Sequence, residues 1–188
     1  AGDLGAAVSL TYENRNLFRG SEVFSVKLRG AYEAITGLEG YQNQNYIEYG
    51  IESKILFPSF MCPFLSYDFK RRSYSTTEIG VSYNLQNRPE FHRRVFSGSV
   101  RYRWTDSSQK HQYKVDIIDL NYVYMPWISS TFKDNYLDNV DNKNVILKYN
   151  YEDLFIMKIG FGMTYSHKNN AFKINCETAG NILNGISH

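Results

Sequence analysis

The chain has 188 residues, with 21 Lys and Arg against 19 Asp and Glu and a formal net charge of +2. This length suits one domain, and the balanced charge gives no electrostatic argument for a nucleic acid or an acidic partner. No apolar run reaches the roughly 18 residues that a transmembrane helix needs, so none is expected. The 16 Tyr and 12 Phe favour strands instead, because aromatic side chains are enriched in β-sheets.

Two alternating runs lie between Leu4 and Ala34, on either side of a polar block that ends in Gly20. Their apolar faces consist of Leu4, Ala6, Val8, Leu10 and Tyr12 in the first run and of Phe24, Val26, Leu28, Tyr32 and Ala34 in the second. Alternate side chains of a strand point to opposite faces, so each run has one apolar and one polar face. The block between them has turn chemistry, and the whole stretch therefore predicts a β-hairpin.

Three further runs of the same kind follow, at residues 46–56, 77–86 and 96–104. Residues 35–44 are predicted to form a loop, and residues 57–75 a connection in which Pro58 and Pro63 forbid central-strand pairing. Residues 88–94, with Pro89 and the basic pair Arg93-Arg94, are predicted to form the next loop.

The last part of the chain contains three more predicted strands and one long irregular segment. The run from Tyr113 to Tyr124 changes phase at Ile117-Ile118, which predicts a β-bulge. The segment that begins at Pro126 and ends at Asp153 breaks the alternation and is predicted to be irregular, with room for a short helix. Residues 157–165 alternate most regularly, and Asn169-Asn170 makes a tight turn into a final run at residues 172–177.

The predicted fold class is all-β: one unit over residues 1–188, an antiparallel up-and-down meander of about eight strands. Alternation alone fits two classes, because a soluble barrel or sandwich turns its apolar face inward and an outer-membrane barrel turns it toward lipid. Three features favour a transmembrane β-barrel. The strands have the roughly 9–11 residues that span a bilayer, and the polar faces are rich in Gly, Ser and charge, which suits a crowded lumen. Aromatic residues also gather at strand ends, as in the girdles of membrane barrels: Tyr12, Tyr32, Phe57, Tyr83, Trp104, Tyr124, Trp127 and Tyr165.

Residues 12–22, with the sequence Tyr-Glu-Asn-Arg-Asn-Leu-Phe-Arg-Gly-Ser-Glu, resemble the early barrel hairpin of the BamA/TamA family of outer-membrane assembly factors, the bacterial surface-antigen type. Residues 63–69, 149–153 and 177–183 are similar to the Bacteroidota branch of that family. The resemblance covers nearly the whole chain. It implies the N-terminal half of a larger barrel, from about its second strand onward, with the POTRA modules and the C-terminal half absent. It also implies that the short turns face the periplasm and the longer loops lie outside the cell.

The resemblance implies a non-enzymatic function in the bacterial outer membrane: insertion or export of other proteins through β-strand pairing at a lateral seam. The implied partners are outer-membrane lipid, client outer-membrane proteins and accessory assembly subunits. Neither seam strand is securely within this chain, so no substrate-binding residue is assigned. A half barrel has two open strand edges, which predicts self-association. The alternative function is that of a small eight-stranded barrel, in the outer membrane or soluble, that binds a partner through the long loop from Pro126 to Asp153.

No constellation typical of an enzyme is found, and no catalytic, cofactor-binding or metal-binding residue is assigned. The four histidines, His92, His111, His167 and His188, have no metal-site spacing and fall in loops or at strand ends. Ser9 and Ser82 lack a nucleophile motif, and Gly160-Phe161-Gly162 is strand alternation rather than a phosphate loop. The loop carboxylates Asp68, Glu152 and Asp153 have no identifiable partner for acid–base chemistry.

The polar faces carry charges of both signs, which are expected to pair across strands rather than to form a selectivity ring. They are Lys27, Arg29, Glu48, Glu52, Lys54, Glu78, Arg101, Arg103, Lys158 and Lys173. Cys62 and Cys176 fit one disulfide or two free thiols, and their spacing matches no metal site.

Overall fold

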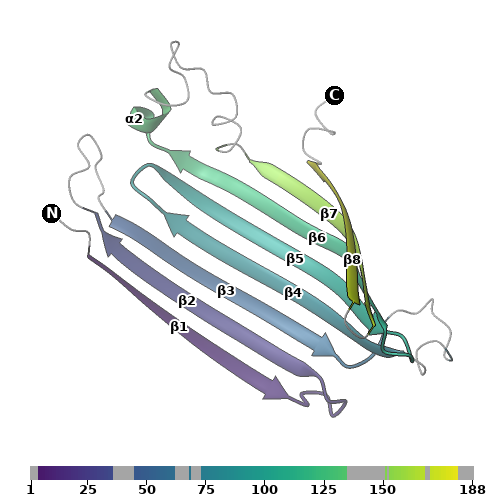
Figure 1. The fold of residues 1–188 in the computed structure, drawn as a ribbon. Coiled ribbons are helices and arrows are strands. Elements are labelled where there is room, and N and C mark those ends of the chain that lie inside the picture. Colours follow the sequence, from purple (N-terminus) through teal and green to yellow (C-terminus); the bar gives the residue numbers. More distant parts are fainter. Residues whose placement is uncertain are drawn as a thin grey trace.

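The computed structural model describes residues 4–35, 45–61, 68, 73–134, 151, 153–167 and 170–181. These residues form one antiparallel sheet in which each strand pairs with its neighbours in the sequence (Figure 1). The strands are β1 (Leu4–Arg15), β2 (Val23–Ala34), β3 (Asn45–Phe57), β4 (Tyr74–Asn87), β5 (Phe91–Thr105), β6 (His111–Ile128), β7 (Leu154–His167) and β8 (Asn170–Asn181), and a short helix, α2 (Ser130–Phe132), follows β6. The predicted all-β meander of eight strands is therefore confirmed. The sheet is open, since β1 does not pair with β8.

Side chains of one kind form continuous rows across the sheet. One apolar row runs through Leu10, Leu28, Ile51, Tyr83, Phe96, Tyr122 and Phe155, each opposite the next. The neighbouring polar row runs through Thr11, Lys27, Glu52, Ser82, Ser97 and Asn121. Because this register holds from strand to strand, the alternation within each strand becomes one apolar and one polar face of the whole sheet.

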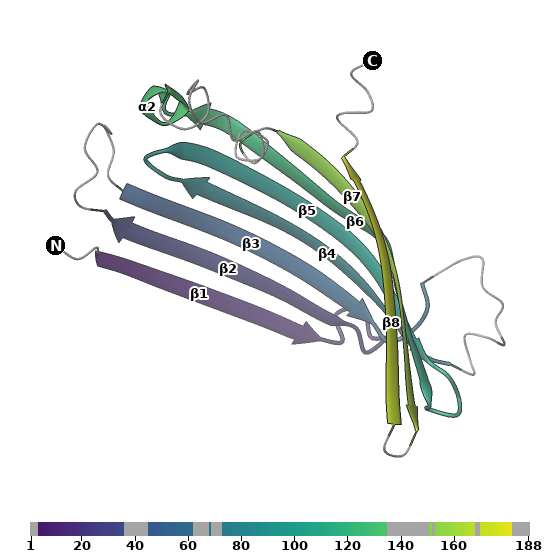
Figure 2. The ribbon, with the colours of Figure 1, turned by 45° about the horizontal axis from the view of Figure 1, so that its top comes forward.

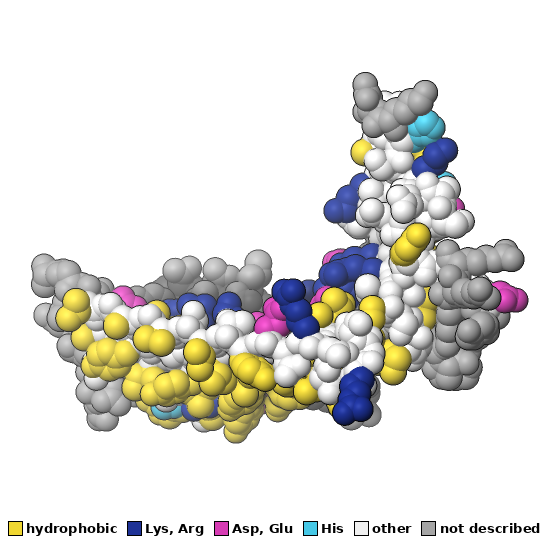
Figure 3. Space-filling model, turned by 90° about the horizontal axis from the view of Figure 1, so that it is seen from below, with side chains coloured by type: hydrophobic (Ala, Val, Ile, Leu, Met, Phe, Trp, Pro, Cys, Tyr) yellow, Lys and Arg dark blue, Asp and Glu magenta, His cyan; other side chains and the backbone are white. Residues whose placement is uncertain are grey.

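The sheet is curved, and β7 and β8 turn away from the plane of β1 to β4 (Figure 2). Hydrophobic side chains gather on the outside of this bend, and charged side chains gather in its inner angle (Figure 3). We call the face with the apolar rows the convex face and the face with the polar rows the concave face. Among the described residues, Phe60 and Val123 are the only buried hydrophobic side chains, so the sheet has no conventional apolar core.

Two glycines on the concave face of β7 make room for the bend. A Cβ atom on Gly162 would lie 3.0 Å from Oδ1 of Asn175 in β8, and one on Gly160 would lie 3.3 Å from Oδ2 of Asp116 in β6. Since β7 has no side chain at these two positions, polar groups of β6 and β8 approach each other across it. Glycine therefore stands where the sheet turns most sharply.

The predicted bulge in β6 is confirmed. The register shifts between Val100 and Arg101 on the side of β5, and between Asp116 and Asp119 on the side of β7. The extra residue at Ile117-Ile118 brings Asp116 and Asp119 onto the same concave face despite their odd spacing in the sequence.

Two predicted loops are shorter than expected, and those predictions were wrong in their bounds. β5 begins at Phe91, so Arg93 and Arg94 lie in a strand. β6 continues through Pro126 to Ile128. Proline is tolerated there because the pairing of β6 with β7 ends at Val123, and because the register with β5 is irregular at this level. The rest of the predicted irregular segment, except residues 129–134, 151 and 153, lies outside the described residues, and α2 is the short helix that it was expected to allow.

The first turn, at residues 16–22, is closed by the carboxylate of Glu22. This carboxylate accepts hydrogen bonds from the backbone N–H of Phe18, at 3.3 Å, and of Gly20, at 3.1 Å. A Cβ atom on Gly20 would overlap the carboxylate, which explains the glycine. Main-chain N–H groups, that of Glu22 itself first and those of Gly20 and Phe18 after it, hold the pKa of the Glu22 carboxyl below its ordinary value. We call the end of the sheet with this turn and the turn at residues 106–110 the turn end, and the opposite end the loop end.

Candidate functional site

The concave face is the more buried of the two, although it is the polar one. The side chains of Glu78 and Asp116 are 19% and 14% exposed there, whereas Ile79 and Val81, on the convex face of the same strand as Glu78, are 36% and 47% exposed. Side chains on the inside of a bend converge and cover one another, and those on the outside splay apart. This partition is the reverse of that of a soluble barrel.

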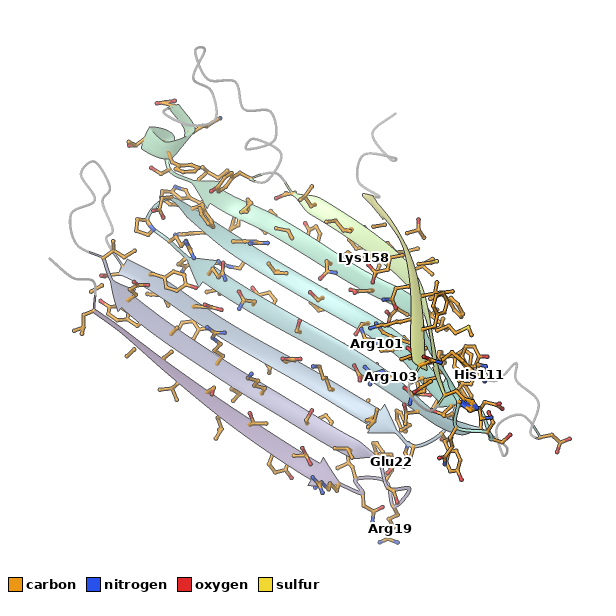
Figure 4. All side chains as sticks on the ribbon, in the orientation of Figure 1. Arg19, Glu22, Arg101, Arg103, His111 and Lys158 are labelled. Atoms are coloured by element: carbon orange, nitrogen blue, oxygen red, sulfur yellow. The ribbon has the colours of Figure 1, made fainter. Side chains whose placement is uncertain are left out.

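A cluster of five charges joins β4, β5 and β6 on the concave face (Figure 4). Arg101 donates through Nη1 to Oε1 of Glu78, at 3.2 Å, and through Nε to Oδ1 of Asp116. Arg103 Nη1 lies 3.4 Å from Oε2 of Glu78, and Lys114 Nζ lies 2.9 Å from Oδ2 of Asp116. Each carboxylate therefore has two cations, and three cations share two carboxylates.

A second polar group joins β2, β3 and β4 toward the loop end. Glu48, 7% exposed, accepts hydrogen bonds from the hydroxyl of Tyr46 and from Nδ2 of Asn84, the latter at 2.9 Å. Arg29 Nε lies 4.0 Å from the same carboxylate, and the guanidinium of Arg88 lies 4.8 Å from the ring centroid of Tyr46. Neutral donors hold the Glu48 carboxylate here, unlike the Arg101 cluster, in which cations hold the carboxylates.

The turn end of the concave face contains a hollow of about 490 Å³ between β4 and β8. Its basic lining residues, Arg103, Lys114 and Lys173, come from three different strands, and Glu177 is its one acidic lining residue. Thr76, Thr105, Gln112, Thr164 and Asn175 add hydroxyl and amide groups. We call this the basic hollow.

Aromatic rings follow one another across the convex face near the turn end. Trp104 stacks on Tyr113 with ring centroids 5.1 Å apart, and His111 lies 5.0 Å from Tyr165 and 6.4 Å from Tyr113. Near the loop end, Tyr122 lies 6.4 Å from Tyr124, and His92 lies 4.7 Å from Trp127. We call these the turn-end belt and the loop-end belt. Between them the convex face of β6 carries Val115, Ile117, Ile118 and Leu120.

The segment after β3 folds back onto the convex face at the turn-end belt. Thr77, 1% exposed, donates through Oγ1 to the carbonyl oxygen of Ser59, at 2.7 Å, and accepts from the N–H of Met61, at 3.0 Å. Phe60, between these two anchors, packs against Tyr102 and Trp104 with centroids 5.8 and 5.6 Å apart. The hydroxyl of Thr77 is thus covered by backbone.

The two outer strands of the described sheet, β1 and β8, each have a neighbour on one side only. In an edge strand, alternate residues direct their N–H and C=O groups away from the sheet, where another strand can bind them. Both strands have 12 residues, as many as β2, so either edge offers a long template.

The described histidines do not form a cluster, whereas charged side chains of neighbouring strands lie together on the concave face. His92, His111 and His167 lie at or next to strand ends, as predicted, and His188 lies outside the described residues. No group of three or more His, Cys, Asp or Glu suited to a metal ion is found in the described part of the chain. Asp153 accepts a hydrogen bond from the N–H of Met125, at 2.8 Å, and Glu152 is not among the described residues. Asp68 is exposed.

The predicted pairing of charges across strands is confirmed for Arg29, Glu48, Glu78, Arg101 and Arg103. Lys54 pairs with Glu52 of its own strand instead. Lys27, Lys158 and Lys173 have no ion pair with any described residue. Sequence reasoning did not single out Lys114, Asp116 and Asp119, because the change of phase at Ile117 obscured which face they occupy. Cys176 is a free, exposed thiol, and Cys62 lies outside the described residues.

No family model, no curated protein and no solved structure matches this chain. No helix among the described residues is long and apolar enough to cross a membrane.

Proposed function

We propose that the sheet is part of the wall of a transmembrane β-barrel of the bacterial outer membrane, with its convex face toward lipid and its concave face toward a water-filled lumen. One observation carries this proposal: the apolar face lies on the outside of the bend, and the charged face lies inside it (Figure 3). A curved sheet that closed around an apolar core would place these faces the other way round.

The aromatic belts support the same assignment. At about 3.3 Å per residue, the strand from Tyr113 to Tyr124 is about 36 Å long. A strand tilted by about 45°, as in membrane barrels, rises by about 25 Å over that length, which is the usual height of the apolar band. Tyr and Trp prefer the two membrane–water interfaces, so the belts fit the borders of the band.

Within this wall, the proposed function is the one that the resemblance to BamA/TamA factors implies: non-enzymatic insertion or export of other proteins by β-augmentation. The observation in its favour is the open up-and-down sheet, in which β1 and β8 each have one free edge where further strands of a larger barrel can pair. The alternative of a small closed barrel finds less support, because the two outer strands are not paired with each other.

Cysteine-directed quenching tests the orientation. In a Cys62→Ser variant, Cys176 is a natural probe on the convex face, opposite Phe161, and its neighbour Asn175 lies on the concave face. A matched set of single cysteines at Ile159, Asn175 and Lys158 in a Cys62→Ser, Cys176→Ser background completes the test. After reconstitution in lipid vesicles, a fluorophore at residue 159 or 176 should respond to a lipid-soluble quencher, and one at residue 158 or 175 to an aqueous quencher. Shielding of residues 159 and 176 from both quenchers would refute the lipid-facing assignment.

A second experiment tests insertion. Unfolded outer-membrane protein is added to vesicles with and without the reconstituted chain, and the rate of its folding is followed by a heat-modifiable gel shift. We expect a faster rate with the chain present. An unchanged rate, together with a positive quenching result, would keep the membrane wall and reject the insertion function.

A further inference from the structure

In the basic hollow, unlike the rest of the concave face, ion pairs between strands do not balance the positive charges. The deeper row, Glu78, Arg101 and Asp116, is satisfied internally. The next row toward the turn end places Arg103 beside Lys114, and both side chains are almost half exposed, at 49% and 43%. Lys173, one row further along β8, has no ion pair with a described residue.

The hollow therefore has more positive charge than its own carboxylates offset. Arg103, Lys114 and Lys173 face a single lining carboxylate, Glu177. Glu78 and Asp116, which pair with the first two, are already shared with Arg101. The remaining lining groups are mostly hydroxyls and amides, which can donate hydrogen bonds to an oxyanion.

We propose that the basic hollow binds an acidic segment of an extended polypeptide, with carboxylates on alternate residues. The inference extends the proposed function, and it rests on that function in taking the ligand to be a client chain. A volume of about 490 Å³ is far larger than one small anion needs.

The spacing of the cations fits such a segment. Lys114 and Lys173 leave strands that are two apart in the sheet, and they differ by one row along the strands, which separates their backbones by about 12 Å. Carboxylates on alternate residues of an extended peptide lie about 7 Å apart on one side. Two flexible lysine side chains can converge over that difference, and Arg103, beside Lys114, can add a two-pronged contact to the same carboxylate.

The glycines of β7 give the proposal a steric basis. Gly162 lines the hollow between Lys114 and Asn175, and because it has no side chain these two side chains can approach each other over it. Glu177, opposite Gly160, lies at the deeper edge and repels a carboxylate there. The ligand is therefore expected to stay at the turn end and not to reach the Arg101 cluster.

Fluorescence anisotropy of labelled peptides tests the inference on the whole chain in detergent micelles. The probe is a short peptide in which Glu alternates with Thr, and the controls replace Glu by Gln or by Lys. We expect saturable binding of the Glu peptide alone, with Kd about fivefold weaker for Lys173→Gln and for Arg103→Gln, the effect of one exposed ion pair. Lys158→Gln is the matched control, since it removes the same charge from the same face toward the loop end (Figure 4). Its Kd should change less than twofold.

Three results would overturn the assignment. Equal weakening by Lys158→Gln and Lys173→Gln would indicate a diffuse field over the whole face. Equal binding of the Gln peptide would remove the role of carboxylates. Displacement of the Glu peptide by inorganic phosphate at the same concentration would identify a site for small oxyanions instead. Loss of peptide binding in a chain whose residues 159 and 176 respond to the lipid quencher rejects the hollow alone. Peptide binding in a chain that fails the quenching test rejects the membrane function alone.

Discussion

Glu48 on the concave face is 7% exposed, and Tyr49, the next residue of β3, is 60% exposed on the convex face. From hydrophobicity alone, Tyr49 would be expected to be more buried than Glu48. In this sheet burial follows curvature instead, because side chains inside the bend crowd together and those outside it spread apart. Crowded polar groups are tolerated only when they are paired, and Glu48, Glu78 and Asp116 on the concave face meet that condition with ion pairs and hydrogen bonds. The convex face is mainly apolar, and in the proposed barrel wall it is lipid that covers it.

The largest expected effect comes from a charge placed on each face at neighbouring positions, which tests the difference between the faces directly. Val81→Lys puts an ammonium on the convex face in the middle of β4, and Ser82→Lys puts one on the concave face opposite Glu52. In lipid vesicles, Val81→Lys should lower the free energy of unfolding by about 3 kcal/mol, the cost of Lys near the bilayer midplane. Ser82→Lys should lower it by less than about 1 kcal/mol, because Glu52 can pair with it. Urea titration measures the free energy of unfolding of both variants. Equal losses would show that the two faces have the same surroundings.

The second prediction concerns the centre of the concave face. Arg101→Leu leaves Glu78 and Asp116 with one cation each, and we expect a loss of about 2 kcal/mol in the free energy of unfolding. Arg103→Leu is the matched control, because Arg103 is half exposed and Glu78 keeps Arg101. Its loss should stay below about 1 kcal/mol. A larger loss for Arg103→Leu than for Arg101→Leu would contradict the shared-cation arrangement.

Thr77 is an exception to the contrast between the two faces, because it is a polar side chain on the convex face. Thr77→Val keeps the shape of the side chain but removes the acceptor for the N–H of Met61 and the donor to Ser59. The expected loss is about 1 kcal/mol, with faster hydrogen exchange at the Met61 amide and altered fluorescence of Trp104. Thr76→Val, on the concave side of the same strand, should leave both signals unchanged.

The smallest expected effect lies outside both faces, at the first turn. The pKa of the Glu22 carboxyl is lowered by main-chain N–H donors, so its stabilising contribution is present above the ordinary pKa of a glutamate. The contribution is lost as the pH falls through the lower pKa of the folded state. Hydrogen exchange at the Phe18 and Gly20 amides should accelerate, after correction for intrinsic rates, when the pH falls from about 5 to about 3. Glu22→Gln should show the faster exchange already at neutral pH, and a pH-independent difference between the two proteins would disprove the role of the charge.

The strands could be predicted because alternation is a local signal. The runs from Leu4 to Ala34 and around Phe161 set the two faces without reference to any distant residue. Even the bulge at Ile117 was predictable, since two successive apolar residues cannot both keep the phase of a regular strand. The ends of β5 and β6 were less predictable. Pro126 normally stops a strand, and it is accepted in β6 only because β7 has already ended beside it.

The basic hollow could not be predicted in the same way. Arg103, Lys114 and Lys173 come together through the bend at β7, and curvature is a property of the whole sheet rather than of any run. The glycines Gly160 and Gly162 were visible in the sequence, but only as positions of an alternating strand. Alternation also does not say which face is concave. The position of the apolar face on the convex side is the observation that supports the lipid-facing orientation.

The bulge at Ile117 determines which side chains of β6 lie on which face of the sheet. Each residue of β6 belongs to one face by whether its place in the strand is odd or even, and the bulge changes that parity once. If the strand ran through this point without the bulge, Leu120, Tyr122 and Tyr124 would exchange faces with Asp119, Asn121 and Val123. Deletion of Ile117 would keep every face, because Ile118 would then follow Asp116 in regular alternation. Related chains should therefore accept the loss of this one residue together with its bulge, and other changes of length in this strand in steps of two.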